Sequence, residues 1–370
     1  MICRIEDIKN ISNTLLLAVD NKEISTVTDT LELSVKDSIL YLSITNREYF
    51  VKSILPIYDD IEFHASVEAI TFLKLISQIT TDIIEFNIKE NYLVIKANGT
   101  YKLPLIYDDD KILELPEIKI NNVVEEFDID GNILYSILIN NSRQLNTGVI
   151  FKPIQKMFYV DEKGAITFTS GACVNNFTLE KPVKLLFNNK LVKLFKLFKS
   201  KKVHFKLGYD KISNDITQTK VYFESDDVII TSILFCDESM INSVPVTAIR
   251  NRANFDYPYS VCINTNNFIQ LINRISIFND KKNIDSCCSF EFDSSNLTVS
   301  SKNNSSTEVL SFEDNLNIDN IYNADLNINE LKNILDSCSN QFINLKFGDN
   351  QAIIIQDYNV TYVIPEVHIE

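Results

Sequence analysis

The sequence predicts an α+β fold built of three tandem domains, each with two helices on antiparallel sheets. The chain has 370 residues, which is too long for one hydrophobic core. One order of predicted elements occurs three times, with a period of about 120 residues that is too long for a solenoid unit. Prolines at 116 and 245 lie near the two junctions. We therefore expect domains at residues 1–120, 121–252 and 253–370.

Each copy begins with a short strand and an amphipathic helix, and a second helix follows about 60 residues later. Apolar residues recur in these helices at spacings of three and four, which is typical of a helix buried on one side. The first helices are expected at residues 6–19, 131–142 and 265–278, and the second at 67–80, 188–202 and 327–339.

Apolar and polar residues alternate in the segments that follow each helix, which indicates antiparallel strands. Turn residues fit hairpins at Asn98-Gly99 and Asp226-Asp227, and Asp357-Tyr358-Asn359 serves the third copy. The strands are expected at 31–35, 39–45, 49–55, 92–97 and 100–106, at 157–160, 165–169, 220–224 and 228–235, and at 289–292, 297–300, 352–356 and 360–365.

Composition argues against a membrane protein and against a metal centre. No apolar run approaches the roughly 18–20 residues that cross a bilayer, and the N-terminus lacks the pattern of a secretory signal, so we expect a cytoplasmic protein. The seven cysteines have no C-x-x-C spacing and the three histidines are scattered, which makes a zinc site improbable. Adjacent Cys287 and Cys288 are better interpreted as buried thiols than as a redox pair.

Motifs for catalysis are absent from the sequence. It contains no G-x-S-x-G, no Walker loop and no H-E-x-x-H, and its seven glycines are too few for a dinucleotide fold. The acidic run at 108–110 is more typical of a solvated loop than of a divalent-ion site. We expect a protein that is not an enzyme and that needs no cofactor.

The net charge of −15 argues at first against nucleic acid, because Lys and Arg contacts to phosphate supply most of that affinity. The distribution is uneven, however: residues 1–120 carry −8, 121–252 carry +3 and 253–370 carry −10. The positive charge of the middle third is concentrated in the predicted helix at 188–202. At about 100° per residue, one face gathers apolar side chains and the other gathers lysines. The apolar set is Leu191, Leu194, Phe195 and Phe198, and the basic set is Lys190, Lys193, Lys196 and Lys199.

The residues alone leave three interpretations of this helix open. It is a solvated helix with extended lysine stems, a helix that binds a membrane or a partner, or a stripe that faces phosphates. Concentration of the lysines on one helix of an acidic chain favours the phosphate-facing stripe.

Five stretches, in order along the chain, resemble the bacterial β sliding-clamp family over its whole length. They are YLVIKANGTYKLPL at 92–105, FTSG at 168–171, VIITSIL at 228–234 before Ser243-Val244, RISIFNDK at 274–281 and YVIP at 362–365. One departure is the turn at 170–173, which reads S-G-A-C where the family usually has D-G-H-R. This difference concerns partner specificity more than the fold.

The resemblance implies a clamp fold and a homodimeric ring that encircles duplex DNA and tethers the replicative polymerase, without catalysis. Sequence-independent contacts to DNA are then expected from Lys190, Lys193, Lys196, Lys199, Lys201, Lys202, Arg143, Arg274, Lys9 and Lys74. An acidic outer surface would repel DNA from the wrong side of such a ring.

The resemblance also implies two protein-binding surfaces. Short peptides of the polymerase and the clamp loader are expected in a groove formed by Thr169, Gly171, Val174, Val244, Val363, Ile364, Pro365, Val367 and Ile369. Ring closure is expected to bring Tyr101 and Leu103 of one copy to Ile277 and Phe278 of the other. Ordinary core packing is the rival interpretation for several of these apolar residues. The alternative function is a structural or interaction protein of tandem clamp-like modules that does not bind DNA.

Overall fold

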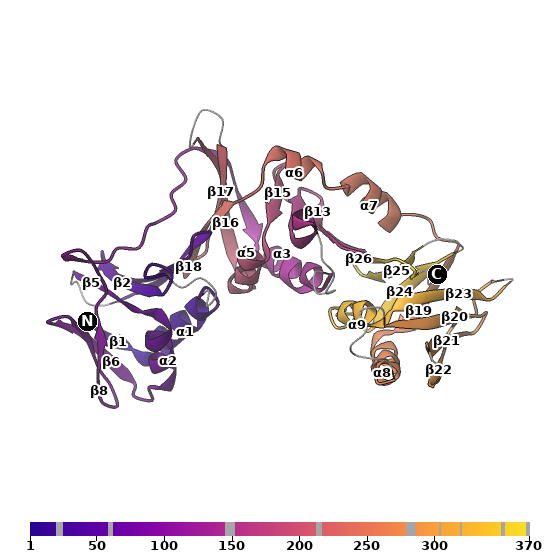
Figure 1. The fold of residues 1–370 in the computed structure, drawn as a ribbon, viewed down its shortest axis with the longest axis horizontal. Coiled ribbons are helices and arrows are strands. Elements are labelled where there is room, and N and C mark those ends of the chain that lie inside the picture. The colour runs from indigo at the N-terminus through magenta and orange to yellow at the C-terminus, as the bar shows by residue number, and fades with distance from the viewer. Residues whose placement is uncertain are drawn as a thin grey trace. The chain divides into compact units, whose positions relative to one another are not determined.

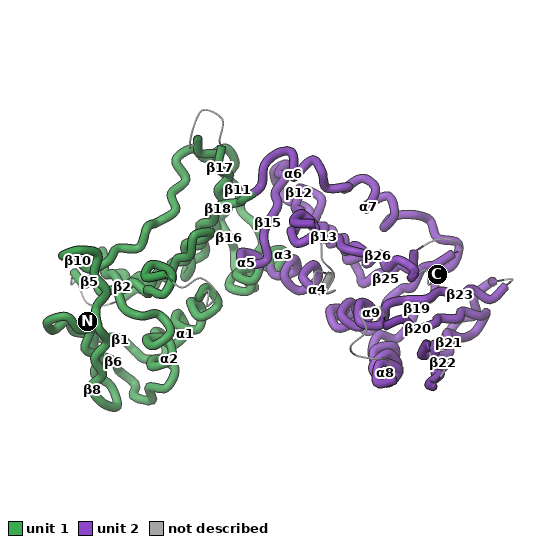
Figure 2. Tube along the Cα trace, viewed as in Figure 1, with its two compact units in different colours: residues 1–134, 193–235 green, residues 135–192, 236–370 purple. Residues whose placement is uncertain are grey.

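The computed structural model in Figure 1 describes residues 1–19, 25–57, 62–144, 152–211, 217–278, 286–302, 305–318, 320–348 and 352–367. Contacts within the chain divide it into two compact units (Figure 2). Unit 1 comprises Met1–Leu134 and Lys193–Phe235, and unit 2 comprises Tyr135–Val192 and Cys236–Glu370. The division falls inside two helices, α3 (Gly131–Ser136) and α5 (Asn189–Leu194).

Unit 1 contains two main antiparallel sheets and two helices, α1 (Ile5–Leu16) and α2 (Ala69–Gln78). Ile8, Leu15, Phe72 and Ile76 on these helices are fully buried, as their three- and four-residue spacing predicts. The smaller sheet has the order β1 (Ile2–Arg4), β6 (Ile83–Lys89), β7 (Tyr92–Lys96) and β8 (Thr100–Pro104). The larger sheet has the order β11 (Val123–Asp130), β16 (Lys202–Lys211), β17 (Thr217–Glu224), β18 (Val228–Leu234), β4 (Tyr49–Pro56), β3 (Ile39–Thr45), β2 (Thr30–Lys36) and β5 (Phe63–Glu68). A short hairpin joins β9 (Tyr107–Asp108) to β10 (Lys111–Ile112).

Unit 2 has the same construction, with helices α8 (Thr265–Ser276) and α9 (Ile328–Leu335) over one apolar core. Its larger sheet has the order β15 (Lys184–Phe187), β12 (Phe158–Asp161), β13 (Gly164–Phe168), β14 (Ala172–Asn176), β26 (Val360–Ile364), β25 (Ile353–Asp357), β24 (Phe342–Phe347) and β19 (Tyr259–Asn264). Its smaller sheet has the order β22 (Thr307–Ser311), β21 (Asn296–Ser301), β20 (Cys287–Phe292) and β23 (Tyr322–Asn327). The remaining helices are α4 (Ser142–Gln144), α6 (Glu238–Asn242), α7 (Val246–Ala253), a π-helix at Ile137–Asn141 and 3₁₀ turns at Pro153–Lys156 and Phe195–Phe198.

The repeated order of elements predicted from the sequence is confirmed. A strand, a helical segment, four strands, a second helix and three strands occur from β1 to β8, from β11 to β18 and from β19 to β26. The two compact units cut across this order, so the boundaries expected at residues 120 and 252 stay a prediction.

The helix predicted at 188–202 is wrong at its C-terminal end. The α-helix stops at Leu194, a 3₁₀ turn follows at Phe195–Phe198, and Lys202 already belongs to strand β16. Ser200 lies between them with φ of 61°, a left-handed conformation that ends a helix. Gly131 approaches this turn so closely that a Cβ there would lie 1.9 Å from the Phe198 carbonyl oxygen. This close approach explains why a glycine begins α3.

Two further predictions are corrected. The helix expected at 131–142 changes to a π-helix after Ser136, and the helix expected at 265–278 ends at Ser276. The segment near residues 244–254, where a domain junction is expected, contains helix α7, which Pro245 immediately precedes, and the junction itself stays a prediction. Proline is tolerated at the start of a helix, because the first N–H groups have no partner within the helix.

Within the part of the chain that the structure describes, none of the helices has the length and apolar character needed to cross a membrane. Among the same residues, no group of three or more His, Cys, Asp or Glu side chains is arranged to hold a metal ion.

Candidate functional site

The lysine helix, which we define as α5 with the 3₁₀ turn at Phe195–Phe198, is anchored by aromatic packing. The rings of Phe195 and Phe198 lie 5.3 and 5.9 Å from the ring of Phe223 on β17. Asn188 caps the helix, because its Oδ1 accepts the N–H of Leu191 at 2.8 Å. The predicted apolar face is therefore confirmed, and all four of its residues are fully buried.

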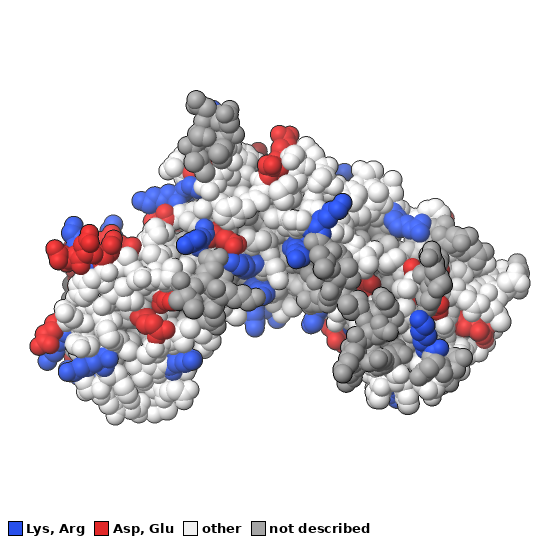
Figure 3. All heavy atoms as spheres, in the orientation of Figure 1, with Lys and Arg blue, Asp and Glu red and all other residues white. Residues whose placement is uncertain are grey.

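The opposite face of the lysine helix presents cations to solvent. Lys193, Lys196 and Lys199 are exposed and Lys190 is half-buried. Among the described residues, Lys193 and Lys196 have no carboxylate partner. Figure 3 shows basic side chains in the region of α5, while acidic side chains gather where the β9–β10 hairpin lies. The lysine helix thus adds exposed positive charge to this region of an acidic chain.

Lys201 and Lys202 differ from the other lysines, because both are paired with carboxylates. The Lys201 ammonium lies 2.7 Å from Asp227, and the Lys202 ammonium lies 2.6 Å from Asp128. Neither residue belongs to the helix, since Lys202 begins β16. Both are among the residues expected to contact DNA, and the pairs reduce the charge that either presents to a polyanion.

The other expected cations lie on separate elements. Lys9 on α1 is half-buried and Lys74 on α2 is exposed, both in unit 1. In unit 2, Arg143 on α4 is half-buried, and Arg274 on α8 forms a bidentate ion pair with Glu308 on β22. The guanidinium of Arg274 lowers the pKa of Glu308 from its ordinary value. Arg274 therefore helps to hold the edge strand β22 against α8.

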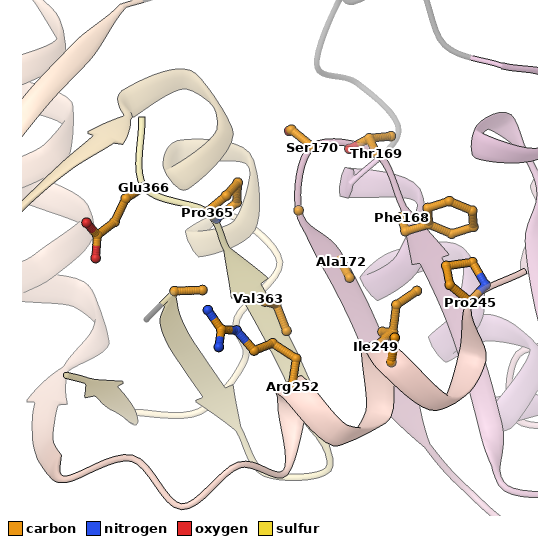
Figure 4. A pocket seen from close by; sticks show the side chains of 13 residues that line it. Phe168, Thr169, Ser170, Ala172, Pro245, Ile249, Arg252, Val363, Pro365 and Glu366 are labelled. Atoms are coloured by element: carbon orange, nitrogen blue, oxygen red, sulfur yellow. The ribbon is translucent and has the colours of Figure 1, made fainter. Parts of the chain in front are cut away.

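A pocket of about 560 Å³ opens in unit 2 between the β13–β14 turn, α7 and the end of β26 (Figure 4). This volume lies within the roughly 300–1,000 Å³ typical of ligand pockets. Its lining is mainly apolar, as binding sites for small apolar groups usually are. The lining residues are Phe168, Thr169, Ser170, Gly171, Ala172, Pro245, Ala248, Ile249, Arg252, Ala352, Val363, Pro365 and Glu366.

Antiparallel pairing of β14 with β26 brings the two sides of the pocket together, although they are almost 200 residues apart in the sequence. Ala172 lies opposite Val363 in this pairing. At the far end of the β14–β26 pairing, the side-chain amides of Asn176 and Asn359 each donate a hydrogen bond to the other residue's backbone carbonyl, at 3.1 and 2.9 Å. The wall of the pocket is therefore part of one continuous sheet.

Four of the nine residues expected in the peptide groove line this pocket: Thr169, Gly171, Val363 and Pro365. Val174 and Val244 belong to the apolar cluster beneath it and are buried, so they support the floor without lining it.

Ile364 and Val367 are also expected in the groove, but neither lines the pocket. Ile364 is buried in the core on the opposite side of the sheet, because adjacent strand residues point to opposite faces. Val367 is half-buried and donates its N–H to the Asp325 carbonyl at 2.8 Å, which places its backbone beside β23. Ile369 lies outside the described residues.

Helix α7 supplies pocket residues that the sequence analysis missed. Pro245, Ala248, Ile249 and Arg252 recur at spacings of three and four, and all four line the pocket. That spacing is a helical signal, and the proline was interpreted instead as a domain junction. The turn also carries a polar contact, because Ser170 donates a hydrogen bond to Glu330 at 3.2 Å.

An ion pair fixes α7 to the sheet. The Arg250 guanidinium forms a bidentate pair with Asp161 at the end of β12, with N–O distances of 2.7 and 2.8 Å. Both side chains are largely buried, and Asp161 raises the pKa of Arg250 above its ordinary value. Neighbouring Tyr159 is also buried, and its pKa is raised to about 12 chiefly by that burial. The position of Arg252 and Ile249 over the pocket therefore depends on the Arg250–Asp161 pair.

The residues expected at a dimer interface differ in exposure. Tyr101 is half-buried and Leu103 is only 9% exposed, since both face the interior side of strand β8. Ile277 and Phe278, just after α8, are 71% and 51% exposed. Among the described residues, strands β8 and β22 each end their sheets, so each has one backbone edge that no described strand pairs with.

Comparison with known proteins shows the fold. The structure matches DNA polymerase III subunit beta of Pseudomonas aeruginosa with a TM-score of 0.82 and 13% identity, covering all of both chains. It matches the DNA polymerase sliding clamp of Bacillus subtilis with a TM-score of 0.80 and 14% identity, over 100% of this chain and 99% of that one. A Helicobacter pylori beta clamp bound to a DNA ligase peptide gives a TM-score of 0.76 and 16% identity, again covering 100% and 99%.

No protein-family model matches the sequence, and no curated protein matches it. The full-length likeness nevertheless shows that the chain has the β-clamp fold, as the five sequence stretches predicted.

Replacing Asp161 with Asn should destabilise unit 2, because the partly buried guanidinium of Arg250 would lose its charged partner. We expect a loss of about 2 kcal/mol and a fall in Tm of roughly 4–8 °C, measured by thermal circular dichroism. The matched control is Lys96→Gln, which breaks the more exposed Lys96–Glu85 pair and should cost less than about 1 kcal/mol. Equal effects of the two changes would contradict a fixing role for the Arg250–Asp161 pair.

Proposed function

We propose that the protein is a DNA sliding clamp, in which two copies close into a ring around duplex DNA and tether the replicative polymerase. The observation that carries the proposal is the full-length likeness to β clamps, with a TM-score of 0.82 over all of both chains. The ring acts in the cytoplasm as a processivity factor, without a cofactor or a reaction of its own.

The lysine helix supports a DNA-facing role. Its exposed ammonium groups interact with phosphates without reading bases, as a surface that slides along DNA requires. The pairing of Lys201, Lys202 and Arg274 with carboxylates lowers the direct affinity for DNA. Retention on DNA then depends on closure of the ring, with Lys190, Lys193, Lys196 and Lys199 assisting placement. Lys9, Lys74 and Arg143 are further proposed contacts.

The pocket in unit 2 supports the binding of partner proteins through short linear segments. One of the structures that this chain resembles is a Helicobacter pylori clamp bound to a DNA ligase peptide. The apolar lining here suits the apolar side chains of such a segment. We propose that the polymerase and the clamp loader both dock in this way, on Thr169, Gly171, Val363 and Pro365.

Ring closure is proposed to join strand β8 of one copy to strand β22 of the other. Both are sheet edges, and pairing them would satisfy backbone groups that are otherwise open to water. Ile277 and Phe278 present exposed apolar surface near α8, and Tyr101 and Leu103 support β8 from its inner face. Three domains per chain give a six-domain ring when two chains close head to tail.

Replacing Ile277 and Phe278 together with Asp should convert the dimer into monomers, because the interface would then bury two unpaired charges. Sedimentation velocity measures this directly. The control is Tyr358→Asp, at the exposed turn between β25 and β26, which belong to a sheet that contains neither β8 nor β22, and it should leave the dimer intact. A stable dimer of the double variant would show that this interface is wrong.

Replacing Lys193 and Lys196 with Ser should weaken direct DNA binding and lower the efficiency of loading onto circular DNA. Because each phosphate contact adds about 0.9 to the salt slope, loss of both should lower the slope of log K against log salt by about 2. Affinity is measured by fluorescence anisotropy at several salt concentrations.

The control for this pair of lysines is Lys36→Ser with Lys89→Ser, which removes the same charge from exposed residues at strand ends of unit 1. An equal fall in slope for the control pair would mean that net charge, and not the lysine helix, governs the contact.

A further inference from the structure

Residues 113–122 of unit 1, which we call the strap, run from β10 to β11 as an extended segment outside any helix or strand (Figure 2). Every second residue of the strap contacts a strand further across the larger sheet. At its beginning, the Leu113 carbonyl accepts the Ser66 hydroxyl on β5 at 2.6 Å. The N–H of Leu115 then donates to the carboxylate of Glu32 on β2 at 2.9 Å. The strap therefore starts on the β5 edge of this sheet.

The middle of the strap is anchored to β4 by charge and by apolar packing. The Lys52 ammonium pairs with Glu117 at 2.8 Å and lies over the Phe50 ring, 5.5 Å from its centre. Leu113 and Leu115 are buried in one cluster with Phe50. Both kinds of contact hold the strap on the strand that pairs with β18.

The end of the strap is anchored to β17 and β16. Lys220 on β17 donates to the Lys119 carbonyl at 2.8 Å, and it pairs with Asp210 on β16 at 2.7 Å. Asp210 also accepts the N–H of Asn121 at 3.2 Å. The Lys220–Asp210 pair is largely buried, and its ammonium lowers the pKa of Asp210 from the ordinary value. The strap is thus fixed to strands on both sides of the β4–β18 pairing.

The β4–β18 pairing joins strands from distant parts of the chain. β4 follows β3 in one hairpin and β18 follows β17 in another, so the two hairpins meet along this pairing. The amides of Ile54 and Ile233 donate across it to the carbonyls of Asp227 and Glu48, at 2.9 and 2.8 Å. Such a pairing can open while the hairpins on either side stay intact, unless another segment spans it.

The strap has almost no slack. The stretch from Leu115 to Asn121 reaches about 20 Å when fully extended. At the usual spacing of neighbouring strands, β2 and β16 lie roughly 24 Å apart, because β3, β4, β18 and β17 lie between them. The side chains of Glu32 and Asp210 bridge the difference. Pro116 adds stiffness, since its ring fixes φ and keeps the residue before it extended.

We propose that the strap acts as a tie across the β4–β18 pairing and keeps the strands on its two sides from bending apart. While the strap is anchored, opening this pairing also requires the release of contacts on β2, β4, β17 and β16. The larger sheet of unit 1 then opens as one cooperative unit. In the ring proposed above, such a tie directs bending away from this pairing, although the tie itself concerns unit 1 alone and does not depend on the ring.

The test lengthens the strap and leaves all of its side chains in place. Two glycines are inserted between Pro116 and Glu117 of the full chain. The control carries two glycines between Asn98 and Gly99, in the β7–β8 hairpin of the smaller sheet. Amide hydrogen exchange is then followed by mass spectrometry with fragmentation to single residues.

Four amides report the result. Ile54 and Ile233 donate across the β4–β18 pairing, whereas Asn46 and Ser225 donate within the β3–β4 and β17–β18 hairpins on either side. With the lengthened strap, exchange at Ile54 and Ile233 should become about tenfold faster, because the pairing then opens by itself. Exchange at Asn46 and Ser225 should change by less than about twofold. All four amides should exchange in the control as they do in the wild type.

Unchanged exchange at Ile54 and Ile233 in the lengthened variant would overturn the proposal, because the strap would then be a connection without a holding role. A parallel rise at all four amides would overturn it as well, because the strap would then add only general stability to unit 1.

A milder pair of variants decides the matter if the lengthened chain fails to fold. Glu117→Gln breaks the pair that the strap makes with Lys52, and Glu85→Gln breaks a pair of similar exposure with Lys96 in the smaller sheet. Exchange at Ile233 should become about threefold faster in Glu117→Gln and should not change in Glu85→Gln. No rise in Glu117→Gln, or the same rise in both variants, would refute the tie.

Discussion

Pairing of strands that are remote in sequence is the constraint on which the rest of this structure depends. In unit 2, β14 pairs with β26, and in unit 1, β18 pairs with β4, so each unit has one eight-stranded sheet. An antiparallel ladder fixes register to the residue, because a slip of one position turns every side chain to the other face. Ala172 therefore meets Val363, and the turn at 169–171 comes to lie beside Pro365. Without that register the pocket would lose one wall.

Charge is arranged on this framework in two ways. Partly buried ion pairs such as Arg250–Asp161 hold elements together, and the two charges of such a pair compensate each other within the protein. Exposed cations such as Lys193 and Lys196 do not hold elements together and remain available to a polyanion. The difference explains how a chain of net charge −15 is compatible with DNA, since the sign of the local surface matters more than the sum.

Much of the fold was accessible from the sequence, because helical and strand periodicities reflect which residues are buried. The apolar face of the lysine helix and strand β3 at residues 39–45 were placed correctly for this reason. Alternation along β26 could also have shown that Val363 and Ile364 do not line the same cavity. The end of the lysine helix could not be read in this way. It depends on the approach of Gly131 to Phe198, a contact between segments 67 residues apart.

The site was less accessible than the fold, because its properties come from contacts between distant segments. Nothing local to Lys201 shows that Asp227 neutralises it. Arg252 was overlooked because the helix that carries it was interpreted as a junction, although its spacing from Pro245 is helical. The position of Arg252 at the pocket can therefore be recognised only once α7 is placed against the sheet.

If the protein stays on DNA because it encloses the duplex, as we propose, its retention depends on whether the DNA is an unbroken circle, and one bound population is compared before and after the circle is cut. The protein is loaded onto nicked circular DNA by a clamp loader with ATP and washed in high salt, which removes proteins held by phosphate contacts. The bound fraction is then counted before and after linearisation by a single-site nuclease. A closed ring should be retained on the circle and lost from the linear form. Equal loss from both forms in high salt would mean that the protein holds DNA by contact and does not enclose it.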